Sequence, residues 1–329
     1  YFIFVALIGF TGVIGEMSFG RATRSGPVDA FGYACGTKGR KKLGELLGYI
    51  PVAGALAMAI GYTVVMGWIL KYMVGAFTGT ALAPSDAGEF SARFGSMASA
   101  FGNNTWQIAA LVIGIVILMF GIGRGIEKAN KIFIPILFVS LIVMAVRALM
   151  LPGATEGLNH YFGFQFGDLL NYKTWLEALT QAVWSAGPGW GLCITLAVFS
   201  KSRSDVTLTS AVNGLGDMFA AVLAGLAVIP ALFAMSPSVE EALAICSSGN
   251  NGLTFIAMTG LVEKMPGGYL MGILFFVSLL MAGLSSNICH FMICSLPLVD
   301  AGKDRKKSIL GVFVLLLIWG LPSAWNSTF

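Results

Sequence analysis

The sequence predicts an all-α, polytopic membrane protein, and three observations support this prediction. Of the 329 residues, 57% are hydrophobic and only 11% are charged, whereas a soluble domain carries about 25% charged residues. Eight apolar segments are long enough for membrane-spanning helices, which take about 20 residues each. Because lipid cannot hydrogen-bond a bare backbone, these segments are expected to be helices rather than strands. The composition excludes a soluble enzyme, a nucleic-acid-binding module and a disordered chain.

Eight spans are expected to form a single transmembrane domain over residues 1–329, joined by loops of alternating charge. The spans lie at about 1–19, 46–77, 107–124, 131–151, 175–200, 207–236, 268–300 and 308–326. Fifteen of the 20 Lys and Arg residues lie in every second loop, at 20–45, 124–131, 201–206 and 301–307. The positive-inside rule places these loops in the cytoplasm and both ends of the chain outside.

The start of the chain does not look like a signal peptide. Residues 1–5 already belong to an apolar run, with no charged region before it and no small-residue cleavage site after it. We therefore expect a piece of a longer protein of the cell membrane. The five cysteines have no metal-binding spacing, and polar residues are too sparse to build an enzyme's reaction centre, so no cofactor is expected.

The fifth span contains a sequence that an unbroken helix does not tolerate. Between Trp184 and Gly191 the chain reads Trp-Ser-Ala-Gly-Pro-Gly-Trp-Gly, and proline and glycine both disfavour a helix interior. Irregular backbone at membrane depth is found only where it is buried in protein or lines a cavity. The stretch predicts two half-helices that meet at a binding site; a kinked packing helix is the alternative.

Asp217 lies about ten residues into the sixth span, among apolar residues. A carboxylate at this depth costs several kcal/mol unless it is paired, hydrated or bound to a cation. It is therefore a candidate cation ligand or proton carrier, and a protonated carboxyl group hydrogen-bonded to a neighbouring helix is the alternative.

The seventh span carries Ala282, Ser285 and Ser286 at offsets that place them on one helix face. One carbonyl and two hydroxyls form a partial shell for a small hard cation, which prefers oxygen ligands. Small and hydroxyl residues also serve close helix packing, so both interpretations stay open. His290 follows Ser286 by one turn, either as a hydrogen-bonded core residue or as part of a cavity.

Four further residues invite interpretation. Tyr62 in the second span needs a hydrogen-bond partner if buried, either a backbone carbonyl or a substrate carboxylate. Glu16 precedes Arg21 by five residues, and a local ion pair is expected. Gly125 and Pro135 bracket the start of the fourth span, where either an unwinding stretch or a plain helix start fits.

Taken together, these residues resemble the neurotransmitter:sodium symporter family, which has the LeuT fold. The resemblance rests on Glu16–Arg21, Gly61–Trp68, the Gly125-x9-Pro135 spacing, Ser185–Gly191 and Ala282–Ser286, in family order over essentially the whole chain. It implies a LeuT-like inverted-repeat transporter that is incomplete, with the segments matching family helices two to nine. The family's first helix and the helices after nine would be absent.

The resemblance also implies a role for each candidate residue. Ser185 and Asp217 would contribute to a first sodium site, and Ala282, Ser285 and Ser286 to a second. Tyr62 would hydrogen-bond the substrate carboxylate. The substrate pocket would be lined by Met58, Tyr62, Trp184, Gly187, Trp190, Ser286 and His290. The gating residues would be Gly125, Pro135, Trp184 as outer lid, and Phe199. Many family members have Asn at the Asp217 position, and the carboxylate here favours chloride independence.

The expected function is sodium-coupled symport of amino acids or related small amines by alternating access. The expected partners are the substrate, sodium ions and the lipid bilayer, with no nucleic acid and with a homodimer as an option. A proton-coupled transporter, in which Asp217 or His290 titrates, and a transport-inactive substrate-binding protein are the alternatives.

Overall fold

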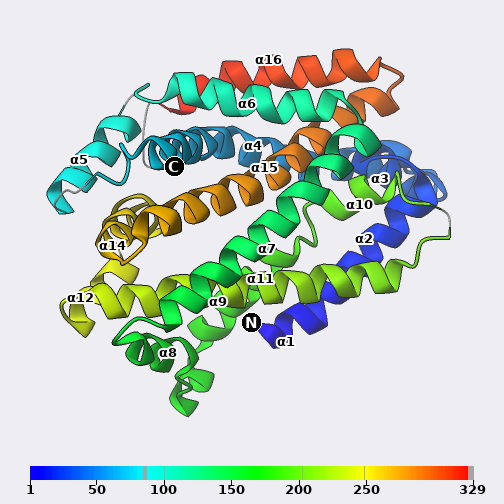
Figure 1. Ribbon diagram of the computed structural model, residues 1–329. Helices are drawn as coiled ribbons and strands as arrows, with labels where there is room; N and C mark the ends of the chain where they lie inside the picture. Colours follow the sequence, from blue (N-terminus) through cyan, green and yellow to red (C-terminus); the bar gives the residue numbers. More distant parts are fainter. Residues whose placement is uncertain (84–86, 100, 202, 248, 325–329) are drawn as a thin grey trace.

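The computed structural model describes residues 1–83, 87–99, 101–201, 203–247 and 249–324, and every regular element in these ranges is helical (Figure 1). Several of the helices are long and apolar enough to cross a membrane. The prediction of an all-α membrane protein is therefore confirmed.

Five of the expected spans are continuous helical segments. They are α1, η1 and α2 together (Phe2–Thr23), α4 (Lys41–Thr78), the end of η2 with α7 (Gly123–Leu149), α11 (Val206–Met235) and α15 (Gly268–Asp300). Their lengths of 22 to 38 residues meet or exceed what a bilayer requires. Within the first of these, η1 (Val5–Gly9) is a π-helical turn between α1 (Phe2–Phe4) and α2 (Phe10–Thr23).

The other three expected spans are shorter or divided. The third is α6 (Asn104–Met119), which has 16 residues, and the eighth is α16 (Arg305–Ser323), which has 19; residues 325 and 326 of the expected eighth span lie outside the described part of the chain. The fifth is divided into α9 (Tyr172–Ala186) and α10 (Leu192–Ala197).

Short helices occupy the two ends of the bundle (Figure 1). At the end that holds the basic loops, α3 (Pro27–Gly36) packs against α4. The opposite end is formed by α5 (Ala87–Ala98), α8 (Ala154–Phe162), η3 (Phe166–Leu170), α12 (Val239–Cys246), α13 (Gly249–Asn251), η4 (Gly252–Ala257) and α14 (Met258–Lys264). The long outer loops of the sequence therefore contain short helices.

The apolar core forms where α15 crosses its neighbours. α15 packs against α4, α7, α6 and α16, and its Phe276 and Phe291 are completely buried. Burial of one such side chain contributes roughly 1.5–3 kcal/mol. α11 packs against α7, α8 and α2. The divided span α9–α10 lies between these groups, with α10 against α2 and α15 and α9 against α11.

Candidate functional site

The fifth span is broken at the predicted place. α9 ends at Ala186 and α10 begins at Leu192, and Gly187, Gly189 and Gly191 between them all have positive φ angles, of 79°, 91° and 71°. This left-handed region is one that residues with a Cβ rarely adopt. The three glycines therefore permit a path that ends one helix and starts the next inside the bundle.

Glu16 of α2 forms a hydrogen bond with the backbone at this break. The backbone N–H of Gly189 donates to Glu16 Oε1 at 2.5 Å, and the carboxylate also faces the backbone N–H groups of Gly191 and Cys193. This acceptor satisfies the Gly189 donor, which the interrupted helix leaves free. The expectation that Glu16 pairs with Arg21 is wrong, because Arg21 Nη1 instead donates to the carbonyl of Ser204 at 2.5 Å.

A polar cluster lies at the end of α9. The hydroxyl of Ser185 donates to Asp217 Oδ2 at 2.5 Å, and the hydroxyl of Tyr1 donates to the same oxygen at 2.9 Å. The Tyr1 hydroxyl also lies 3.2 Å from the Ser185 hydroxyl oxygen. Sequence reasoning paired Ser185 with Asp217 as ligands of one ion but missed Tyr1, which lies 216 residues from Asp217.

Asn213 is a second residue that sequence reasoning missed. It lies one helical turn before Asp217 on α11, and its side-chain Nδ2 donates to the carbonyl of Ala186 at 3.4 Å. Asn213 therefore joins α11 to the last residue of α9, beside Ser185. The four-residue spacing between Asn213 and Asp217 was a signal that could have pointed to it, since such residues share a helix face.

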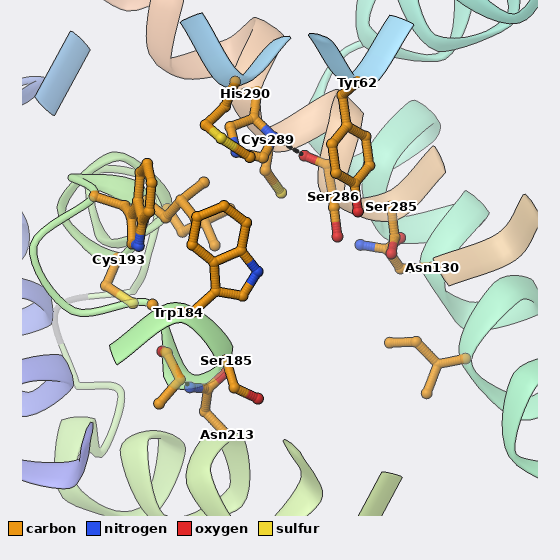
Figure 2. A pocket seen from close by; sticks show the side chains of 17 residues that line it. Tyr62, Asn130, Trp184, Ser185, Cys193, Asn213, Ser285, Ser286, Cys289 and His290 are labelled. Carbon is orange, nitrogen blue, oxygen red and sulfur yellow. Dashed lines mark hydrogen bonds between the residues drawn. The ribbon is translucent and has the colours of Figure 1, made fainter. Parts of the chain in front are cut away.

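The residues of the second predicted cation site lie together on α15. The Ser285 hydroxyl donates to the Ala282 carbonyl at 2.8 Å. Figure 2 shows the side chains of Ser285 and Ser286 beside Tyr62 of α4 and Asn130 of α7. Asn130 was not singled out from the sequence, and its Oδ1 is buried without a hydrogen bond to any described residue.

These groups border a cavity of about 330 Å³ between α4, α7, α9, α10, α11 and α15 (Figure 2). All seven predicted substrate-binding residues line it, namely Met58, Tyr62, Trp184, Gly187, Trp190, Ser286 and His290. Ser185, Ser285, Asn130 and Asn213 line it as well. Asp217 and Ala282 lie behind the lining. Asp217 accepts a hydrogen bond from Ser185, and Ala282 accepts one from Ser285.

The predicted gating residues lie outside this lining, except Trp184. Gly125 belongs to η2 (Ile122–Ile126) and Pro135 to α7 (Glu127–Leu149), so the stretch between them is helical in this structure, as a plain helix start requires. Phe199 is 44% exposed beyond the end of α10. Trp184 is 53% exposed and meets Trp190 edge to face, with ring centroids 5.3 Å apart.

Two glycines of the break offer a matched test of its packing. A Cβ at Gly191 would lie 2.9 Å from Pro27 Cγ and 3.1 Å from Pro51 Cβ, whereas a Cβ at Gly187 would lie no closer than 3.9 Å to Leu192. Both substitutions by alanine carry the left-handed strain of about 1–2 kcal/mol, and Gly191→Ala adds overpacking of about 1–3 kcal/mol. Gly191→Ala is therefore expected to lower the melting temperature in detergent more than Gly187→Ala does. Equal shifts would contradict the close packing of Gly191 against Pro27 and Pro51.

Multi-pass secondary transporters have binding sites where a spanning helix is broken in the middle of the bundle. This chain has such a break, with an acidic and hydroxyl cluster on one side of the cavity and the hydroxyls of a helix face on another. Residues 87–327 match the family model described as "Sodium:neurotransmitter symporter family". The chain belongs to this family.

Individual relatives agree with this assignment. An uncharacterised sodium-dependent transporter of Methanocaldococcus jannaschii is 30% identical over 292 residues, which are 83% of this chain and 58% of the relative. The sodium-dependent serotonin transporter of Drosophila melanogaster is 26% identical, over 84% of this chain and 51% of its own length. The chain thus spans between half and three fifths of these two relatives, which are transporters and not enzymes.

A solved structure has the same fold over almost the whole length of this chain. The crystal structure of MhsT in complex with L-phenylalanine is similar with a TM-score of 0.84 and 29% sequence identity. The match covers 98% of this chain and 70% of that one. The LeuT-like transporter fold predicted from the sequence is confirmed by this match.

Proposed function

We propose that this chain forms the substrate- and ion-binding part of a sodium-coupled symporter of amino acids or related small amines. The observation that carries the proposal is the Ser185–Asp217 pair at the break of the fifth span, beside the 330 Å³ cavity. A carboxylate beside a hydroxyl offers the oxygen ligands that a hard cation prefers. The L-phenylalanine in the related MhsT structure supports an amino acid as the substrate.

Each group of residues has a role in this proposal. Ser185 and Asp217 contribute to a first sodium site, with the amide oxygen of Asn213 as a further ligand within reach of the same helix end. Ala282, Ser285 and Ser286 contribute to a second. Tyr62 hydrogen-bonds the substrate carboxylate, and the other lining residues, Met58, Trp184, Gly187, Trp190 and His290, enclose the rest of the molecule.

The cycle is alternating access. Sodium orders the polar groups around the break, and the amino acid then binds between α9, α10, α4 and α15. Trp184 covers the pocket from outside, while unwinding between Gly125 and Pro135 and movement near Phe199 open the inner side. The transporter functions in the cell membrane, in a bacterial inner membrane in our proposal, and homodimerisation is compatible with this role.

Transport is expected to be independent of chloride. The hydroxyls of Tyr1 and Ser185 both donate to the Asp217 carboxylate, so a chloride ion in this place would meet a fixed negative charge and no free donor from these two groups. The complete protein in proteoliposomes is expected to accumulate tritiated amino acids down a sodium gradient, and replacement of chloride by gluconate is expected to leave uptake unchanged.

The outcome of this uptake experiment separates the candidate functions. Collapse of uptake in gluconate would contradict chloride independence alone. Uptake driven by a proton gradient without sodium would contradict sodium coupling and show a proton-coupled transporter instead. Binding of an amino acid without any flux would favour the transport-inactive binding protein.

A further inference from the structure

His290 is the one imidazole that lines the cavity within the described residues, and its orientation is fixed by a single hydrogen bond. Its Nδ1 lies 2.9 Å from the carbonyl oxygen of Ser286, one turn earlier on α15 (Figure 2). A carbonyl oxygen can only accept a hydrogen bond, so Nδ1 must carry the hydrogen. The side chain is 7% exposed, and its ring packs near that of Tyr62, with centroids 5.9 Å apart.

The other ring nitrogen is therefore an acceptor. In a neutral imidazole with hydrogen on Nδ1, Nε2 carries a lone pair. The two nitrogens point in divergent directions, so Nε2 points away from the α15 backbone that Nδ1 contacts. Nε2 makes no hydrogen bond with any residue that the structure describes, although the side chain lines the cavity.

The surroundings of His290 make this acceptor distinctive. Figure 2 shows Tyr62, Ser285, Ser286 and Asn130 gathered on one side of the cavity, with Trp184 and Cys193 across from them. The lining also includes apolar or sulfur-bearing side chains and indoles, namely Met58, Trp190, Leu192, Cys193, Leu196 and Cys289. Indole nitrogens only donate and thiols accept weakly, so none of these side chains competes with Nε2 of His290 as a hydrogen-bond acceptor.

We propose that His290 selects amino acids whose neutral side chain carries a hydrogen-bond donor, which binds Nε2 of His290 inside the cavity. This inference rests on the proposed amino-acid transport and names the substrate class for it. A site built around a buried acceptor rejects an analogue without the donor, because the acceptor is then left unpaired. Amino acids with aliphatic or plain aromatic side chains are therefore expected to bind more weakly.

The test compares amino acids of the same shape with and without a donor. Threonine against valine, glutamine against methionine and tyrosine against phenylalanine are titrated into the complete purified protein in sodium buffer at about pH 8, above the ordinary His pKa of about 6.5. Binding is read from the shift in melting temperature, and uptake of the tighter member of each pair is followed in proteoliposomes. In at least one pair the donor-bearing member is expected to bind about tenfold more tightly.

Variants then assign the preference to the imidazole. His290→Leu removes the acceptor at similar volume. It is expected to bring the ratio of the two affinities within that pair, donor-bearing over donor-free, to about one or below. His290→Gln, whose amide oxygen accepts a hydrogen bond, is expected to keep part of the preference. Ser278→Ala is the matched control, since Ser278 is also buried on α15 and bonds a backbone carbonyl, that of Leu274, away from the cavity.

Each outcome supports or overturns the inference. Transport with no difference within any pair, or a difference that survives in His290→Leu, overturns the role of His290 and leaves amino-acid transport standing. Absence of both binding and uptake for all amino acids overturns the proposed function and this inference with it. A lower ratio in Ser278→Ala as well would show a general effect of α15 and would also overturn it.

Discussion

Substituting Asp217 with alanine is expected to abolish sodium-dependent uptake. The carboxylate accepts hydrogen bonds from Tyr1 and Ser185 and is the acidic group nearest the break on α11. A pair of opposite charges about 4 Å apart is worth roughly 4 kcal/mol at an effective dielectric constant of 20, which corresponds to about a thousandfold in affinity. Sodium titrations of initial uptake rates would measure the change.

Two variants of the same helix control this prediction. Asp217→Glu keeps the charge and is expected to keep part of the sodium dependence. Asp205, the N-cap of α11, accepts from the Leu208 N–H at 2.9 Å and lies at the helix end, so Asp205→Ser should keep the cap and the sodium dependence. Unchanged uptake by Asp217→Ala would remove Asp217 from the first sodium site.

Removal of the Glu16 carboxylate is expected to be the most damaging change to the break itself. Glu16→Ala leaves the Gly189 N–H without its acceptor at membrane depth, where an unsatisfied backbone group costs several kcal/mol. We expect a lower melting temperature in detergent and a loss of uptake on the order of a hundredfold.

The comparison variants separate this effect from a general loss of acidic residues. Glu16→Gln keeps one acceptor oxygen but turns an amide nitrogen toward backbone donors, so an intermediate loss is expected. Glu127 forms an exposed pair with Lys131 at 2.8 Å on α7, and exposed ion pairs contribute little to the free energy of unfolding. If Glu16→Ala melted no lower than Glu127→Ala, the carboxylate would not be what holds the break.

The sequence was informative wherever chemistry and spacing fall within one segment. Proline and three glycines between Trp184 and Gly191 have few compatible conformations in lipid, so the break could be predicted. The one-face spacing of Ala282, Ser285 and Ser286 could be predicted because helical periodicity alone determines it.

Residues whose role depends on a distant partner were missed or misassigned. Glu16 was given the near partner, Arg21, whereas its partner in the fold, Gly189, lies 173 residues away. Tyr1 meets Ser185 and Asp217 only through packing of the first span against the fifth and sixth. No local pattern encodes such contacts, because they arise when separate helices are brought together. The resemblance to a family, by contrast, paired Ser185 with Asp217 across two spans, which no local pattern does.

The extent of the third span was harder to predict, for a different reason. The span expected at about 107–124 appears as a helix of 16 residues, Asn104–Met119, since hydropathy measures how apolar a stretch is and not whether its backbone stays regular. The stretch from Gly125 to Pro135 illustrates the reverse case, in which residues that disfavour helices lie in a continuous helix in this structure.

Three polar side chains tie α2 and its C-cap to the break and to the chain that follows it. Glu16 holds Gly189, Arg21 holds the Ser204 carbonyl, and Arg24 donates to the carbonyls of Val198 and Ser200. These hydrogen bonds join α2 to the chain at both ends of α10, so sliding of one helix past the other would break them. α2 and α10 are therefore expected to move as one rigid pair, with Gly187, on the side of α9, outside these contacts.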